Sequence, residues 1–211
     1  MLVLASASPR RRDLLTQAGF AFTVLAPSVC EDVVTGETAI GYVLRLAREK
    51  AEAVAASPEL RVLAGHDDEP PLILGADTTV IAPTGEILVK PENDADAARM
   101  LRLLSGAVHQ VITGVALLAG EAAAVAAEVT HVTMLTLSEA EIAAYVATGE
   151  PHGKAGAYAI QGRAGRWIPR VHGCYFNVVG LPLALVTSMI EGAQLRQGRE
   201  GHARRTAQQA G

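Results

Sequence analysis

Cysteine is nearly absent from this chain, and its absence excludes two kinds of architecture. Cys30 and Cys174 are the only two cysteines, and they lie far apart in the sequence. The chain has no Cys-x-x-Cys and no two histidines at metal-ligand spacing. Because structural zinc sites and disulfide frameworks need such clusters, the sequence predicts neither. The scarcity of cysteine fits a protein of the reducing cytoplasm.

The chain also has little that could enter a membrane. Its longest apolar stretch, residues 111–129, is interrupted by Glu121 and Glu128 and is rich in alanine and glycine, which makes it a poor membrane span. The short apolar start comes before the arginines at 10–12, the reverse of the order in a signal peptide. We therefore expect a cytoplasmic protein with no membrane partner.

Aromatic residues and positive charge are both scarce. Aromatics make up 4% of the chain, and 18 basic against 22 acidic residues give a net charge of −4 at pH 7. Binding nucleic acid by base stacking on a basic surface needs more of both, so we expect no nucleic-acid partner. Residues 192–211 have one leucine, no aromatic and four arginines, which predicts a disordered basic tail. Because four arginines and one glutamate give this tail +3, residues 1–191 carry −7.

What the chain does contain is an alternation of strand and helix patterns, which is typical of an α/β protein. The hydrophobic spacing and the bordering turn residues predict strands at 2–6, 20–27, 72–82, 109–119 and 123–137. The last two are expected to form a hairpin through Gly120. Helices are expected at 9–18, 38–56, 94–105 and 138–148. Residues 56–71 are predicted to be an exposed excursion, and the glycine-rich segment 153–180 a loop across the mouth of a site.

The sequence SASPRRR near the start indicates an anion site. Ser8 suits a helix N-cap and Pro9 the first helical position, which places the three arginines that follow in the first turn. Cations are disfavoured at that end of a helix, whereas an anion is favoured by free N–H groups and by the arginines themselves. The pattern therefore favours a phosphate seat, with a solvated basic helix end as the alternative.

Lysine is rare, and its few positions suggest a shared role. Fifteen of the 18 basic residues are arginine, and the three lysines are Lys50, Lys90 and Lys154. Because arginine is the default cation here, each retained lysine indicates a place that needs a compact ammonium group. Three such groups converging on one site would suit a triphosphate; chance placement is the alternative.

Two acidic positions complete this inventory. Asp77 lies within an apolar strand pattern, and Glu31 follows the preceding strand directly. A carboxylate in either place is a structural hydrogen-bond acceptor, a general base or a metal ligand. Together with the lysines and arginines, these carboxylates favour divalent-metal phosphoryl chemistry. The chain has no P-loop and no Gly-x-Gly-x-x-Gly after a strand, so the usual ATPase and dinucleotide sites are excluded.

Seven ordered blocks of sequence resemble one known family. The blocks are LASASPRRRDLL, YVLRLAREKA, LILGADTTV, LVKPEND, LSGAVHQVITGVAL, KAGAYAIQG and NVVGLPL, and they run from Leu4 to about Val186. This series resembles the Maf family of nucleoside triphosphate pyrophosphatases. The resemblance implies a single α/β domain over residues 1–191, with an elongated mixed β-sheet, flanking helices and two lobes around a deep cleft. It also implies hydrolysis between the α and β phosphates with a divalent cation, Mg²⁺, Mn²⁺ or Co²⁺.

The resemblance also implies roles for individual residues. Asp77 matches the family's proton acceptor, and Glu31 its metal ligand, with Asp77 sharing the metal. The expected catalytic set is Glu31, Lys50, Asp77 and Lys90. The expected phosphate-binding set is Ser6, Ser8, Arg10, Arg11 and Lys154.

The combination of Arg11, Thr78 and Gln161 is similar to the branch of the family that acts on dTTP and UTP. A glutamine amide can both donate to and accept from the edge of a pyrimidine base. Two alternatives remain open: a pyrophosphatase for modified purine triphosphates such as 7-methyl-GTP, and a nucleotide-binding cell-division regulator with little catalysis. A homodimer is one expected assembly.

Overall fold

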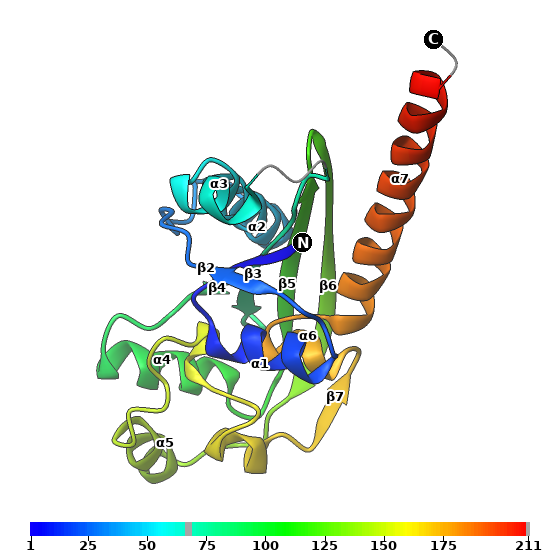
Figure 1. Cartoon of the computed structure of the whole chain (residues 1–211). Helices are drawn as coiled ribbons and strands as arrows, with labels where there is room; N and C mark the ends of the chain where they lie inside the picture. The colour runs from blue at the N-terminus through cyan, green and yellow to red at the C-terminus, as the bar shows by residue number, and fades with distance from the viewer. Residues whose placement is uncertain (66–68, 210–211) are drawn as a thin grey trace.

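The protein is described here from a computed structural model that covers residues 1–65 and 69–209, the side chains of 200–209 excepted. Figure 1 shows one β-sheet with helices packed around it. Within the described residues the sheet has seven strands, β1 (Leu2–Ala5), β2 (Thr23–Leu25), β3 (Leu72–Ile81), β4 (Ile87–Leu88), β5 (Val108–Ala119), β6 (Ala122–Thr133) and β7 (Arg170–His172). The helices are α1 (Pro9–Gln17), α2 (Ala39–Ala55), α3 (Pro58–Ala64), α4 (Asp94–Leu104), α5 (Glu139–Val146), α6 (Tyr175–Val179) and α7 (Leu183–Gln209). Two short 3₁₀ turns are η1 (Ala155–Ala157) and η2 (Arg163–Trp167).

The sheet is mixed, as the sequence predicts. Its order is β2-β1-β3-β5-β6-β7, with β4 paired to β3 off this path. The first three strands in this order are parallel, and the pairs β3–β5, β5–β6 and β6–β7 are antiparallel. The β5–β6 hairpin turns at Gly120, whose φ of 61° is a left-handed conformation that glycine adopts readily. The expected hairpin is therefore confirmed.

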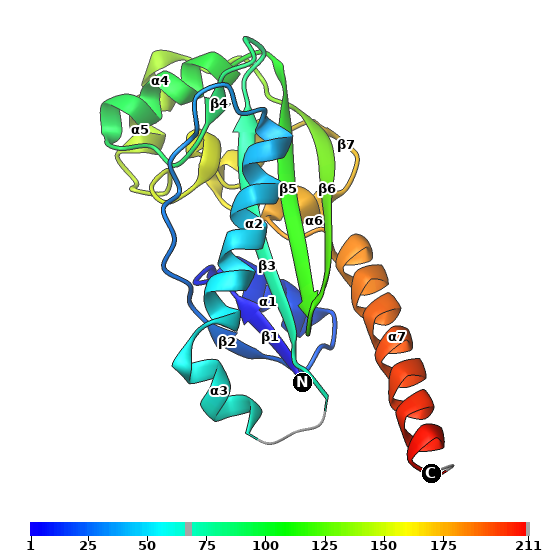
Figure 2. The same ribbon diagram turned by 90° about the horizontal axis from the view of Figure 1, so that it is seen from above.

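Alternate residues of the central strands face different helices. Leu2 and Leu4 pack with α1 and α7, whereas Val3 and Ala5 pack against α2. Since side chains of a strand alternate between the two faces of the sheet, both faces of β1 are buried. Figure 2 shows α2 crossing one face, with α1 and α6 on the other. The central strands are apolar on both faces for this reason.

Two glycines let α2 lie directly on the sheet. A Cβ atom at Gly75 would stand 2.1 Å from the Ala47 carbonyl oxygen, and one at Gly114 would stand 2.3 Å from the Val43 carbonyl oxygen. Both contacts are with backbone, which cannot move aside as a side chain can. The absence of side chains at these two positions therefore sets the depth at which α2 packs, and with it the position of Lys50.

Helix starts follow the sequence signals closely. Ser138 begins α5 with a capping box, in which its side chain accepts from the Glu141 N–H and the Glu141 side chain accepts from the Ser138 N–H. The side-chain oxygens of Thr38 and Ser57 cap α2 and α3. Ser8 does stand at the N-cap of α1 with Pro9 after it, but its side chain makes no capping hydrogen bond.

Three segments differ from the sequence expectations. Residues 153–180 are not simply a loop, since η1, η2, β7 and α6 lie within them; β7 depends on pairing with β6, and such distant partners leave no local pattern. The excursion 56–71 contains α3, while residues 66–68 lie outside the described part. Residues 192–209 continue α7 instead of forming a disordered tail, because their Ala, Gln, Arg and Glu residues favour helix.

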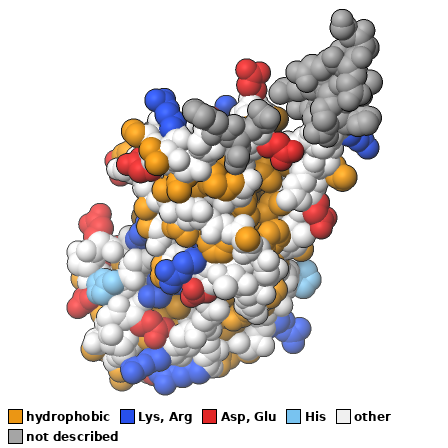
Figure 3. Space-filling view, viewed as in Figure 1, with side chains coloured by type: hydrophobic (Ala, Val, Ile, Leu, Met, Phe, Trp, Pro, Cys, Tyr) orange, Lys and Arg blue, Asp and Glu red, His pale blue; other side chains and the backbone are white. Residues whose placement is uncertain are grey.

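The long C-terminal helix starts in the core and then leaves it. Val186 and Ile190 are buried against the sheet, whereas Leu195 is 67% exposed. Figure 1 and Figure 2 both show α7 leading away from the body of the molecule. On the face seen in Figure 3, hydrophobic side chains gather between α3 and α7. Within the described residues, no helix is both long and apolar enough to cross a bilayer.

Candidate active site

A cavity of about 410 Å³ opens at the carboxyl end of β1. The ladder between β1 and β3 ends at Gly75, and the ladder between β3 and β4 begins at Val80. The stretch of β3 between these ladders lines the cavity with Asp77 and Thr78. The rest of the lining comes from the turn before α1, the loops after β2 and β4, α2, and residues 153–161 and 178–180. Ligands of open α/β sheets bind at such carboxyl strand ends.

A second hollow, of about 770 Å³, lies along α7. The described residues that line it all belong to this one helix, between Glu191 and Arg199. Among these described residues, no charged groups from different elements come together. The smaller cavity at the end of β1 is therefore the candidate active site.

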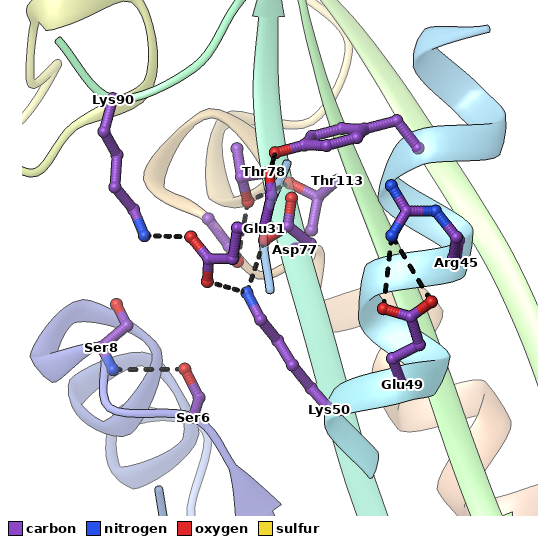
Figure 4. Close-up of polar contacts among 12 residues, drawn as sticks. Ser6, Ser8, Glu31, Arg45, Glu49, Lys50, Asp77, Thr78, Lys90 and Thr113 are labelled. Atoms are coloured by element: carbon purple, nitrogen blue, oxygen red, sulfur yellow. Dashed lines mark hydrogen bonds and ion pairs between the residues drawn. The ribbon is translucent and has the colours of Figure 1, made fainter. Parts of the chain in front are cut away.

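Two carboxylates and two lysines meet on one side of the cavity. Lys50 Nζ lies 2.6 Å from Glu31 Oε1 and 2.6 Å from Asp77 Oδ1, while Lys90 Nζ pairs with Glu31 Oε2. The Lys50 and Asp77 side chains are 8% and 10% exposed, whereas Lys90 is 57% exposed. Figure 4 shows Lys50 reaching from α2 and Lys90 from the opposite side toward Glu31. The four residues of the expected catalytic set thus converge in space.

Glu31 lies on a loop that α2 holds in place. The Tyr42 hydroxyl donates to the Glu31 carbonyl oxygen at 2.9 Å, and Arg45 donates to the Asp32 carbonyl oxygen at 3.0 Å. Burial favours the neutral form of the Glu31 carboxyl group, but the hydrogen bonds from Lys50 and Lys90 outweigh it and lower its pKa to about 2. Glu31 is therefore a permanent anion at neutral pH.

Arg11 lies on the opposite face of β3 from Lys50. Asp77 points toward α2, so the next side chain, Thr78, points toward α1, and its Oγ1 accepts from Arg11 at 3.0 Å. Arg11 also donates to the Gly180 carbonyl oxygen at 2.9 Å and to Ser6 Oγ at 3.2 Å. Burial lowers the pKa of this guanidinium, an effect that the charge of Asp77 opposes. Arg11 is thus held by three protein groups at the wall of the cavity.

The Thr78 hydroxyl continues this network into the core. Its Oγ1 lies 2.9 Å from Thr113 Oγ1, and the Thr113 hydroxyl donates to the Asn177 carbonyl oxygen at 3.1 Å. Both Thr113 and Asn177 are fully buried. The chain of hydrogen bonds therefore joins β3, β5 and α6 behind the Arg11 guanidinium.

The turn before α1 presents the expected anion seat. Ser6 Oγ accepts from the Ser8 N–H at 3.2 Å, which shapes the turn, and both serines line the cavity with Arg10. Burial lowers the pKa of Arg10. Burial and the nearby charge of Arg10 lower the pKa of Lys154. Because burial disfavours the charged forms of Arg10 and Lys154, a phosphate bound beside them would stabilise those forms.

The remaining two expected site residues line the far side of the cavity. Lys154 Nζ donates to the Glu150 carbonyl oxygen at 2.5 Å, and Gln161 is exposed at the cavity wall. The cavity lining therefore includes every residue that the sequence reasoning assigned to catalysis, phosphate binding or base selection.

Several residues that shape the site were not singled out from the sequence. Tyr42 lies two helical turns before Lys50 on the same face of α2, a spacing that could have indicated it. Thr113 and Asn177 act through partners far away in the chain, whereas Tyr145 and Glu150 contact a turn 14 and 13 residues along. In neither case does a periodic pattern in the sequence indicate the contact.

Comparisons with known proteins identify the family of the chain. The family model described as "Maf-like protein" matches residues 1–193. A dTTP/UTP pyrophosphatase of Koribacter versatilis is 47% identical over 192 residues, 91% of this chain and 94% of the relative. One of Salmonella typhimurium is 48% identical over 203 residues, 95% and 98% of the two chains. One of Geobacter sulfurreducens is 49% identical over 187 residues, 88% and 92%. On its sequence and fold together, the chain belongs to the Maf family.

Proposed function

We propose that this protein hydrolyses dTTP and UTP between the α and β phosphates, giving the monophosphate and pyrophosphate. The observation that carries the proposal is the convergence of Asp77, Glu31, Lys50 and Lys90 on one cavity with the arginine turn and Gln161. The relatives named dTTP/UTP pyrophosphatase, each aligned over nearly its whole length, support the same activity. Such activity belongs in the cytoplasm, where nucleotide pools lie.

Asp77 is the group that accepts a proton from water. Lys50 binds its Oδ1 at 2.6 Å, which orients the carboxylate and leaves the second oxygen, Oδ2, to take the proton. The oxygen of that water then bonds to the α-phosphorus. The bond from the α-phosphorus to the bridging oxygen breaks, and its electron pair leaves with pyrophosphate. Lys50 and Lys90 offset the negative charge that grows on the phosphates.

Glu31 and Asp77 fit a divalent cation. Both are carboxylates at the cavity, and Mg²⁺ binds through one or two such groups together with substrate phosphates. Across residues 1–65 and 69–199, no three His, Cys, Asp or Glu side chains gather as a ready-made metal site, so phosphate oxygens and water would complete the coordination. When bound, Mg²⁺, Mn²⁺ or Co²⁺ supplies positive charge that polarises the phosphate oxygens.

The phosphates and the base are bound by two sets of residues that share Arg11. Ser6, Ser8, Arg10, Arg11 and Lys154 surround the position for the phosphate chain with N–H, hydroxyl and cationic donors. Base selection falls to Arg11, Thr78 and Gln161. An amide at Gln161 pairs with the donor and acceptor groups on a thymine or uracil edge.

The proposal is tested by measuring pyrophosphate release from dTTP, UTP, CTP, GTP and 7-methyl-GTP, each with Mg²⁺, Mn²⁺ and Co²⁺. We expect kcat/KM to be highest for dTTP and UTP, with pyrophosphate and monophosphate as the products. If activity were highest on 7-methyl-GTP, the substrates would be modified purine triphosphates and not dTTP and UTP. Release of inorganic phosphate and the nucleoside diphosphate would refute cleavage at the α–β bond. Nucleotide binding with no pyrophosphate release would favour a regulator.

The base assignment has a separate test in Gln161→Glu. This change removes the amide donor and places a carboxylate beside a base carbonyl. We expect kcat/KM for dTTP and UTP to fall more than about tenfold, since a site that hydrogen-bonds a substrate group discriminates strongly. Inhibition by free pyrophosphate, which has no base, should change little. Equal losses for every ligand would make Gln161 structural.

A further inference from the structure

Gln161 lies inside a tight turn, and both ends of that turn are held from outside. The Gly162 N–H donates to the Ala159 carbonyl oxygen at 3.0 Å, which closes the turn around Gln161. The turn sits between η1 and η2 and belongs to neither a long helix nor a strand. Its conformation must therefore be fixed by contacts with other parts of the chain.

One pair of side chains supplies those contacts. The Ala159 N–H donates to the Tyr145 hydroxyl oxygen at 3.3 Å, and the Arg163 N–H donates to Glu150 Oε1 at 2.9 Å. The Tyr145 hydroxyl donates in turn to Glu150 Oε1, also at 2.9 Å. The two backbone groups that flank Gln161 thus end on the same tyrosine–carboxylate pair. A displacement of either side chain moves one end of the turn relative to the other.

The pair is itself rigid. The Tyr145 ring is buried in the core and meets Trp167 edge to face at 5.3 Å between ring centroids. Burial and the hydrogen bond to Glu150 raise the pKa of Tyr145, so its hydroxyl stays a donor at all physiological pH values. A Cβ atom at Gly162 would stand 2.0 Å from Glu150 Oε1, so the carboxylate lies directly against the turn.

Glu150 also contacts the phosphate side of the cavity, through a different group. Its backbone carbonyl oxygen accepts from Lys154 Nζ at 2.5 Å. The carboxylate therefore serves the turn around Gln161, and the main chain serves Lys154. Side-chain substitution separates the two, because it removes the first contact and keeps the carbonyl group of the second.

We propose that Glu150, with Tyr145, is a positioning residue for base selection: its carboxylate fixes the turn that aims the Gln161 amide into the cavity. The inference rests on the proposed role of Gln161 in reading the base. Glu150 touches neither base nor phosphate in this arrangement; it acts through Gln161. Its loss should therefore impair discrimination between bases while leaving the phosphate site in place.

The experiment compares Glu150→Ala, Gln161→Ala and the double variant. For each, kcat and KM are measured with dTTP and GTP, together with the inhibition constant of pyrophosphate. We expect Glu150→Ala to lower the ratio of dTTP to GTP efficiency by about tenfold, through KM more than kcat, with pyrophosphate inhibition nearly unchanged. Because Glu150 acts through Gln161, the double variant should lose no more discrimination than Gln161→Ala alone.

Two conservative changes and one control separate positioning from general stability. Glu150→Gln keeps an oxygen that can accept from both the Arg163 N–H and the Tyr145 hydroxyl, so it should retain most of the ratio. Tyr145→Phe keeps the ring against Trp167 and removes both hydroxyl contacts, so it should lower the ratio and carries the test if Glu150→Ala does not fold. Ser57→Ala is the control, since it removes the side-chain cap of α3 and none of the contacts to Tyr145, Glu150 or Trp167; it should lower Tm and leave the ratio unchanged.

The outcomes distinguish the positioning role of Glu150 from the base-reading role of Gln161. If Gln161→Ala lowers the ratio and folded Glu150→Ala and Tyr145→Phe do not, the positioning role is overturned and the proposed function stands. If Gln161→Ala leaves the ratio unchanged, the base-reading role fails and the positioning role fails with it. Additive losses in the double variant would mean that Glu150 acts by a route other than Gln161.

Discussion

The two sides of the cavity are built by different means. Asp77 and Lys50 come from a ten-residue strand and a seventeen-residue helix that are packed backbone to backbone. Lys154 and Gln161 come from a segment whose regular elements are short turns, and Glu150 accepts hydrogen bonds from Lys154 and from Arg163, two residues after Gln161. The first side is set by secondary structure and the second by individual side chains. The geometry for proton transfer and the geometry for base selection therefore depend on different parts of the fold.

The sharpest test of the first side is Asp77→Asn. Asparagine keeps an oxygen for Lys50, so the fold should be preserved, but the amide cannot accept the proton from water. We expect kcat for dTTP to fall about 10²–10⁴-fold, the usual range for losing a general base, with Tm nearly unchanged. Asp32→Asn changes an exposed carboxylate next to Glu31 in the chain and should retain wild-type turnover. Near wild-type activity of Asp77→Asn would remove the proton-accepting role.

The two lysines of the first side should differ in their tolerance of arginine. Lys50 is 8% exposed and touches two carboxylates, whereas Lys90 is 57% exposed. Because a guanidinium is larger and planar, we expect Lys50→Arg to lower kcat/KM about 10²-fold and Lys90→Arg about tenfold or less. Steady-state kinetics on dTTP measure both. Equal losses would show that burial does not decide the need for an ammonium group.

Packing under α2 can be disturbed without touching the site's side chains. Gly114→Ala places a Cβ atom 2.3 Å from the Val43 carbonyl oxygen. We expect a loss of about 3 kcal/mol in the free energy of unfolding, the upper part of the range for overpacking, measured by urea denaturation. Gly198→Ala, in α7 with nothing within 4 Å of the new atom, should be neutral or slightly stabilising. A neutral Gly114→Ala would mean that α2 is not seated by this contact.

A smaller effect comes from a histidine that the sequence analysis did not single out. His109 is 2% exposed, its Nε2 lies 2.7 Å from the Tyr158 hydroxyl, and burial lowers its pKa from 6.5 to about 4. Since the unfolded chain then binds more protons below pH 6.5, stability falls as the pH drops toward 4. The stability difference between wild type and His109→Gln should narrow by about 2 kcal/mol from pH 7 to pH 5. A difference that is constant with pH would contradict the buried neutral state.

Local patterns were sufficient for the first side of the cavity. The apolar run around Asp77, the helical spacing through Lys50 and the turn signals at Gly120 all act within a few residues, and the structure has the strand, helix and hairpin that they predict. Because the chain has only three lysines, its composition alone indicates that Lys50, Lys90 and Lys154 share a role, and all three line the cavity. Burial, charge and periodicity are properties that a sequence displays directly.

The contacts that hold the second side of the cavity could not be predicted from local patterns. Tyr145 and Glu150 hold the turn around Gln161 from helix α5 and the loop after it, and β7 forms by pairing with β6, with His172 opposite His131. These contacts join residues that are more than ten positions apart and whose types are common at surfaces. Composition likewise failed for residues 192–209, where low apolar content predicted disorder but good helix formers continue α7.

The three hydrogen bonds on Arg11 have a consequence for the entropy of recognition. A free arginine side chain carries about 2 kcal/mol of rotamer entropy. Arg11 loses this freedom when the protein folds, because the Gly180 carbonyl, Thr78 and Ser6 fix its planar head. A ligand that binds at this wall therefore contacts a guanidinium that is already ordered. The entropy cost of that ordering lowers the free energy of unfolding of the free protein and does not weaken binding. Half-buried Arg10, whose head has more freedom, must still be ordered by whatever binds beside it.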